Sequence, residues 1–171
     1  FLSVLLNTTA PGTAVPSFAP RWAVPGLPSS LKESVAATDV NGDGRPDVVV
    51  PRTKHGAHSV DVWLTGNDGT LERISRVPTC EGPNQVQTGD LNADGHMDVV
   101  VVCTGNTTTL TGGGVIAMLG DGEGNLDPQP LLNVGMIPSS VTMGDFNGDG
   151  HLDVAASSLY GGHVTVLAGD G

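Results

Sequence analysis

The chain has 171 residues, 25 glycines, few aromatic residues and a formal net charge of −11. This length suffices for one domain with its own core, and abundant glycine, valine and threonine are typical of short strands joined by tight turns. The acidic balance argues against nucleic-acid binding, which needs a basic surface. No stretch reaches the roughly 18 apolar residues of a membrane-spanning helix. We therefore expect an all-β protein with no nucleic-acid partner and no membrane span.

The N-terminal segment predicts two strands, in LSVLLN and in PSFAPRWAV. The first residues, FLSVLLNTTAPG, lack an initiator methionine and a basic region, so we interpret them as a mature end or an internal cut and not as a signal peptide. We assign residues 1–28 to the last strands of a preceding structural unit.

The next unit, residues 29–78, contains a motif crowded with polar side chains: Asp39-Val-Asn41-Gly-Asp43-Gly-Arg45-Pro-Asp47. A short alternating stretch, SVAAT, precedes the motif, and a buried-looking strand, DVVVP, follows it. A third strand, VDVWLTG, and a weaker fourth, LERISRV, complete the unit. The pattern predicts four short antiparallel strands, with the motif in the loop between the first two.

The same unit recurs twice. Residues 79–135 carry a second motif at 90–98, and residues 136–171 carry a third at 145–153, with no fourth strand after the third. The fourth strand of the second unit is expected in LDPQPLLNV. Four short strands repeated about every 50 residues are typical of β-propeller blades. We therefore expect an all-β chain of four-stranded antiparallel blades, forming a partial propeller of about three to four blades.

The motif has the ligand pattern of a loop that binds a hard cation. Two carboxylates about 4 Å apart repel by roughly 4 kcal/mol at an effective dielectric near 20, so a positive ion is expected among them. Oxygen ligands at positions one, three and five, with glycine at six, suit calcium, which accepts six to eight oxygens. An EF-hand is excluded because position twelve is apolar in every copy (Val50, Val101 and Ala156) and no flanking helices are predicted. The alternative is an Asx-rich turn without metal.

D-x-N-x-D-G-x-x-D between two strands resembles the FG-GAP or VCBS repeat, and the VCBS form is closer because the Phe-Gly and Gly-Ala-Pro signatures are absent. The resemblance implies three calcium ions on the rim of a propeller of seven blades, of which this chain is a piece, in a secreted or cell-surface protein. It implies a scaffold for adhesion or recognition of an extracellular protein or glycan, and not an enzyme. Self-assembly of copies into one ring is the alternative. The implied ligands are Asp39, Asn41, Asp43, Arg45 and Asp47; Asp90, Asn92, Asp94, His96 and Asp98; and Asp145, Asn147, Asp149, His151 and Asp153, where residue seven of each motif donates its carbonyl oxygen.

The alternative function is the propeller of a polysaccharide lyase-like enzyme or a glycan-binding module. That function needs basic or tyrosine side chains around an acidic sugar, and only Tyr160 and the N-terminal basic residues are available. All seven Lys and Arg residues lie at or before Arg76.

Several other side chains have two interpretations each. Cys80 and Cys103 predict a disulfide that fits an extracellular setting, with residue 85 opposite residue 103 in the hairpin; two free thiols are the alternative. His55 and His58 either supply two ligands of a zinc site or belong to a polar loop between strands. Acidic residues of GDGEGNLD bind a weak extra cation or form a hairpin turn. Trp22 and Trp63 either pack within the protein or stack on a sugar ring of a ligand. Asn7 and Asn106 fit the acceptor pattern for N-glycosylation.

Overall fold

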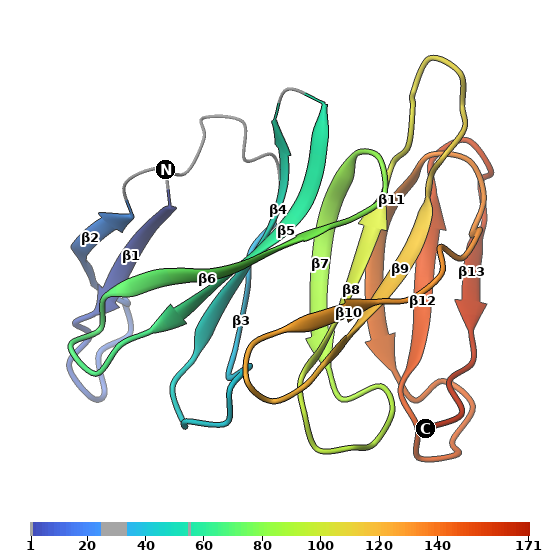
Figure 1. Ribbon diagram of the computed structural model, residues 1–171. Helices are drawn as coiled ribbons and strands as arrows, with labels where there is room; N and C mark the ends of the chain where they lie inside the picture. The colour runs from blue at the N-terminus through green and yellow to red at the C-terminus, as the bar shows by residue number, and fades with distance from the viewer. Residues whose placement is uncertain (1, 25–33, 55) are drawn as a thin grey trace.

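The computed structural model describes residues 2–24, 34–54 and 56–171. These residues form strands joined by turns, which confirms the predicted all-β class (Figure 1). An antiparallel hairpin of β1 (Leu2–Asn7) and β2 (Phe18–Val24) comes first. No helix long and apolar enough to cross a bilayer occurs in the described part of the chain.

The first four-stranded sheet contains β3 (Ala36–Thr38), β4 (Asp47–Lys54), β5 (Ala57–Thr65) and β6 (Leu71–Pro78), in that order and antiparallel. The order follows the chain because each connection is a short turn between neighbouring strands. This is the meander predicted for one blade.

The second sheet repeats the arrangement with β7 (Pro83–Gly89), β8 (Asp98–Cys103), β9 (Gly114–Gly120) and β10 (Leu126–Pro128). Its fourth strand is shorter than the predicted LDPQPLLNV. Pro128 and Pro130 have no N–H to donate, so regular pairing stops, and beyond it the structure shows an isolated bridge between Val115 and Leu132.

The third sheet contains β11 (Pro138–Gly144), β12 (Asp153–Ser158) and β13 (Val164–Leu167). In Figure 1 the sheets stand side by side along the chain, with β13 farthest from the N-terminal hairpin. Each sheet is blade-like, as the repeat predicts.

The core lies between neighbouring sheets. One apolar cluster joins the first and second sheets and includes Val49, Val60 and Val101; another joins the second and third and includes Val100 and Val154. Alternation along β8 explains this, because Val100 and Val101 point to opposite faces. A continuous apolar strand such as DVVVVC therefore marks a sheet buried on both faces.

A disulfide joins Cys80 to Cys103 across 23 residues of sequence, which confirms the predicted bridge. The predicted register was wrong: Pro83, and not residue 85, lies opposite Cys103. The regular part of the hairpin pairs Gln85 with Val102, one residue away from the predicted register, and a bulge between Pro83 and Gln85 adds a second residue of shift. Fewer residues therefore separate Cys80 from the position opposite Cys103.

Reduction of this disulfide should lower the free energy of unfolding by roughly 3 kcal/mol, because the bond closes a loop of moderate length in the unfolded chain. Urea unfolding of the oxidised protein and of the Cys80→Ser/Cys103→Ser variant measures the difference. Equal stabilities would show that the bridge contributes nothing to the fold.

Candidate metal centres

The three motifs lie at the same end of their sheets, at the bottom of the view in Figure 1. Each motif is the loop from the first to the second strand of its sheet, as predicted: β3 to β4, β7 to β8 and β11 to β12. The fold thus places twelve of the predicted ligands, at positions one, three, five and seven, on equivalent loops of three sheets, and the three acids of position nine at the first residue of the strand that follows.

The acidic and amide side chains at positions one, three and five fold back onto the loop backbone. In the second loop the carboxylate of Asp90 accepts hydrogen bonds from the N–H groups of Asp94 (3.1 Å) and Gly95 (2.9 Å). Asn92 Oδ1 also accepts from Asp94 N (3.3 Å), and Asn92 Nδ2 donates to Asp94 Oδ2 (2.8 Å). Gly95 adopts a φ of 87°, which only glycine adopts readily. The loop therefore gathers these side chains around its own backbone.

The other two loops repeat these bonds. Asp39 and Asp145 take the role of Asp90. Their carboxylates accept hydrogen bonds from the backbone N–H groups at motif positions five and six, at 2.7–3.2 Å. The side-chain amide at motif position three again donates a hydrogen bond to the carboxylate at position five, at 2.9 Å in the first loop and 2.7 Å in the third. The residues in these roles are Asp39, Asn41 and Asp43 in the first loop and Asp145, Asn147 and Asp149 in the third.

The acid at position nine has a different environment. Asp98 is fully buried, and its two oxygens accept hydrogen bonds from Leu91 N and Gly120 N, both at 2.8 Å. The pattern holds in the other sheets, where the buried carboxylates of Asp47 and Asp153 accept from the equivalent pairs of N–H groups: Val40 and Thr65 for Asp47, and Phe146 and Gly169 for Asp153. This acid therefore ties the start of the loop to the end of the third strand.

These environments shift the carboxylate pKa values in opposite directions. Burial raises the pKa of Asp47 and of Asp98, and the charges of the other acids in the same loop raise both further, against the backbone N–H donors. By contrast, the backbone N–H of His96 lowers the pKa of Asp94, as that of His151 does for Asp149, and the Asn41 amide lowers the pKa of Asp43. A carboxylate buried near other carboxylates favours a proton or a cation nearby.

The donor set of each loop fits a hard cation, because it consists of carboxylate, amide and carbonyl oxygens. A carboxylate oxygen that accepts one N–H bond keeps a second lone pair for a ligand. In the described part of the chain, no three His, Cys, Asp or Glu side chains are gathered closely enough to hold a metal ion. The loops present the predicted ligands in the order of the motif, and coordination of one ion requires their carboxylates to come closer together than they lie in this structure.

Position seven distinguishes the first loop from the other two. The Arg45 guanidinium forms an ion pair with Asp43 and donates from Nε to Thr65 O at 2.7 Å. In the second loop the His96 ring lies against Gly122, where an added Cβ would meet its Nδ1 at 2.3 Å. His151 lies in the same way against Gly171. The first loop therefore carries its own cationic side chain beside a predicted ligand.

Two other predicted sites have structural explanations. Asp121 accepts hydrogen bonds from Glu123 N (2.8 Å), Asn125 N (3.0 Å) and Asn125 Nδ2 (2.7 Å), which confirms the hairpin-turn interpretation. His58 lies in β5, and not in a loop as predicted, and its Nδ1 contacts Thr53 Oγ1 and Gly82 N, both at 3.3 Å. His55 falls outside the described residues.

Sequence reasoning missed a cluster of basic side chains on the first sheet. The buried carboxylate of Asp61 forms two hydrogen bonds with Arg76, at 2.7 and 2.8 Å. Arg73 and Arg52 approach the same carboxylate at 3.6 and 3.8 Å. Arg73 also lies over the Trp63 ring at 5.8 Å, and Trp63 is buried, as the packing interpretation predicts. Three arginines thus share one carboxylate, which leaves an excess of positive charge.

The cluster depends on the register of one hairpin, between β5 and β6. Asp61 pairs with Arg76, and Trp63 pairs with Arg73, only because a bulge between Val62 and Trp63 shifts the register. Nothing in the strand pattern locates that bulge.

Comparison with known proteins agrees with the repeated architecture. A family model described as an FG-GAP-like repeat matches residues 39–101 and 102–156, which together are more than half of the chain. No match is found among curated proteins.

Proposed function

Because the chain belongs to the FG-GAP-like repeat family, we propose that its three loops bind calcium and stabilise a β-propeller segment of a secreted or cell-surface protein. The observation that carries this proposal is the recurrence of one hydrogen-bond pattern around the same four side chains in all three loops. A pattern kept in all three loops supports a common role for these side chains, which we propose is to bind one kind of ion.

Each ion would be held by the side chains at positions one, three, five and nine and by the carbonyl oxygen at position seven. Asp98 and its two counterparts would connect the ion to the third strand, because their oxygens already bind backbone N–H groups there. The calcium is structural in this proposal: it neutralises the carboxylates and holds the loop in one conformation, and it takes no part in a reaction.

Calorimetric titration with calcium and with magnesium tests the proposal. We expect calcium to bind and magnesium to bind more weakly, since magnesium demands near-ideal octahedral geometry and keeps several waters. The Asp94→Asn/Asp149→Asn variant should lose the heat that comes from the second and third loops. Absence of calcium binding, or binding unchanged in the variant, would contradict the proposal.

The first loop should bind calcium more weakly than the others, because Arg45 already neutralises Asp43. We expect Arg45→Gln to increase calcium affinity at this loop severalfold, as one positive charge is removed from beside the ion. Titration of the Asp94→Asn/Asp149→Asn background with and without Arg45→Gln isolates the first loop. An unchanged or reduced affinity would show that the guanidinium does not compete with the ion.

A role in adhesion or recognition, without enzymatic activity, fits the rest of the molecule. The disulfide favours an oxidising compartment outside the cytosol. Rigid sheets that present loops at one end are a scaffold suited to binding.

A second candidate, an acidic glycan as ligand, is favoured by the arginine cluster around Asp61. Arg73 and Arg76 are exposed at the surface, and guanidinium groups bind carboxylate and sulfate groups well. We expect saturable, salt-sensitive binding of a sulfated polysaccharide such as heparin, weakened severalfold by Arg73→Gln.

Arg45→Gln is the matched control, because Arg45 lies in the first loop and not in the cluster. Heparin binding that is equally weak in both variants would indicate a general charge effect, and would contradict a site at Asp61. The release of unsaturated sugars would instead show a lyase.

A further inference from the structure

Two of the three loops contain an asparagine followed by a glycine, and the second loop does not. Positions three and four are Asn41-Gly42 in the first loop and Asn147-Gly148 in the third, the only Asn-Gly pairs in the sequence, whereas the second loop has Asn92-Ala93. The backbone nitrogen that follows an asparagine can attack the side-chain amide. This attack is fastest when the following residue is glycine, because no Cβ crowds the nitrogen. The loops therefore differ at the residue that controls this chemistry.

The structure places both glycines in open surroundings. A Cβ added at Gly42 or Gly148 would meet no atom of the described chain within 4 Å, apart from the neighbouring residues. Both glycines are exposed, and their φ values are positive, at 72° and 81°. Ala93 adopts the same kind of conformation, with a φ of 57°. The second loop therefore holds a methyl group beside the nitrogen that would have to react.

In the third loop, both nitrogen atoms that the reaction involves contact a carboxylate. Gly148 N, the attacking atom, donates to Asp145 Oδ1 at 2.6 Å. Asn147 Nδ2, the atom that leaves, donates to Asp149 Oδ2 at 2.7 Å. The proton that the attacking nitrogen must lose therefore already points at an acceptor, and Asn147 is exposed to the water that the second step needs.

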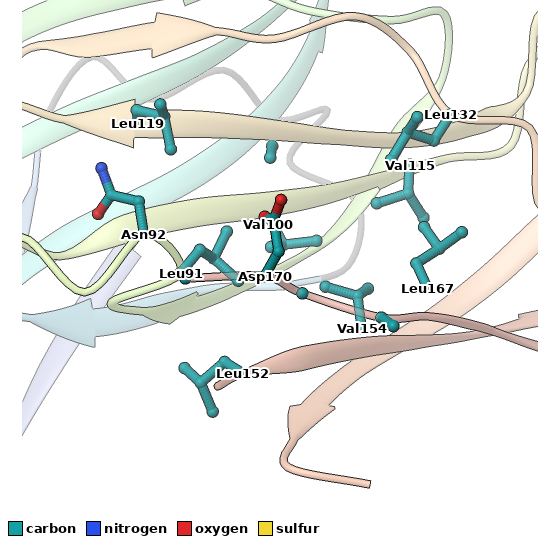
Figure 2. Close-up of a pocket in the computed structure, with 14 residues that line it drawn as sticks. Leu91, Asn92, Val100, Val115, Leu119, Leu132, Leu152, Val154, Leu167 and Asp170 are labelled. Atoms are coloured by element: carbon teal, nitrogen blue, oxygen red, sulfur yellow. The ribbon is translucent and has the colours of Figure 1, made fainter. Parts of the chain in front are cut away.

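The second loop is a matched control within the same chain, because its other contacts are alike. Asn92 Nδ2 donates to Asp94 Oδ2 at 2.8 Å, the same bond as in the other loops. Asn92 is partly exposed, like Asn41, and Figure 2 shows it at a pocket of about 320 Å³ between the second and third sheets. Burial therefore does not protect this amide, and the methyl group of Ala93 is what distinguishes it.

We propose that Asn41 and Asn147 are sites of spontaneous deamidation and isoaspartate formation, and that Asn92 resists this modification. The glycine nitrogen forms a bond to Cγ of the asparagine and loses its proton to a base. The bond between Cγ and Nδ2 breaks, and ammonia leaves. The product is a cyclic imide, which water opens to aspartate or to isoaspartate. The proposal does not depend on calcium binding.

The modification changes the loop in a defined way. The asparagine Nδ2 donates to the carboxylate at position five, whereas the product carries a carboxylate that accepts hydrogen bonds only and repels its neighbour. Isoaspartate also adds a methylene group to the main chain between positions three and four. The first and third loops should therefore lose their hydrogen-bond pattern as the protein ages, and the second loop should keep it.

The test is incubation of the whole 171-residue protein in chelator at mildly alkaline pH, followed by peptic digestion and mass spectrometry at successive times. Each conversion gives the mass increase of an amide changed to an acid, and labelling by an isoaspartyl methyltransferase identifies isoaspartate. We expect Asn41 and Asn147 to convert several times faster than Asn92 in the same sample. A rate at Asn41 or at Asn147 that is no higher than the rate at Asn92 would overturn the proposal.

Two variants exchange the residues that follow asparagine. Ala93→Gly should make Asn92 convert several times faster, and Gly148→Ala should slow Asn147 to the rate of Asn92 while Asn41 in the same molecule is unchanged. Both variants should fold, because the second loop already holds alanine at this φ and glycine adopts it more readily. A rate at Asn92 or Asn147 that its exchange leaves unchanged would also overturn the proposal.

Discussion

Replacing Asp98 by alanine should lower the free energy of unfolding by roughly 2 to 6 kcal/mol, measured by urea denaturation in the presence of a chelator. The Asp98 carboxylate is fully buried and accepts two backbone N–H bonds. Its removal leaves two buried donors without a partner, and each costs about 1–3 kcal/mol. The loop and the third strand also lose the link that the Asp98 side chain makes between Leu91 and Gly120.

Asp94→Ala is the matched control for this experiment, because Asp94 is an exposed acid of the same loop whose carboxylate bonds to His96 N and Asn92 Nδ2 of that loop. We expect it to change stability in chelator by less than about 1 kcal/mol, since surface substitutions usually have small effects. If Asp98→Ala were as mild as Asp94→Ala, the buried acid would not connect the loop to the sheet.

Saturating calcium should produce the other large effect. At a concentration about 100 times the dissociation constant, one site that binds only the folded protein adds roughly 2.7 kcal/mol, so three sites add about 8 kcal/mol. Dissociation constants on the order of 10⁻⁴ to 10⁻³ M are ordinary for extracellular modules. Thermal unfolding in chelator and in rising calcium measures this, with magnesium at matched ionic strength as control. A midpoint that does not change with calcium would exclude a structural role for the metal.

The blades and their loops were predictable because the repeat specifies them three times. Each motif places glycine at position six, and the apolar strand that follows begins at the acid of position nine. In DVVVVC, an unbroken apolar run flanked by turn residues indicates a strand buried on both faces, and β8 is buried along its whole length.

Local irregularities were not predictable, because they depend on contacts between strands. The bulge at Pro83 and Gln85, which moves Cys103 opposite Pro83, leaves no mark in the strand pattern. The bulge that brings Trp63 opposite Arg73 is not visible in the strand pattern either. The sequence alone therefore could not show that the arginines lie together around Asp61.

The position of the candidate loops was predictable, and the different environments of their acidic residues were not. Spacing identified Asp90, Asn92, Asp94 and Asp98 as one set, but it gave no reason to separate Asp98 from the others. That separation arises when β8 and β9 pair, because the N–H of Gly120 then points at the buried carboxylate. The position-nine acid is therefore part of the sheet as well as part of the loop.

Equilibrium dialysis against radioactive calcium tests the central claim most directly, with the unchanged protein and three variants, Asp43→Asn, Asp94→Asn and Asp149→Asn. Each variant removes one exposed carboxylate from a single loop. The account predicts three calcium ions per chain at saturation, and the loss or strong weakening of one site in each variant. Fewer than one ion bound per chain, or a stoichiometry that none of the three substitutions changes, would contradict it.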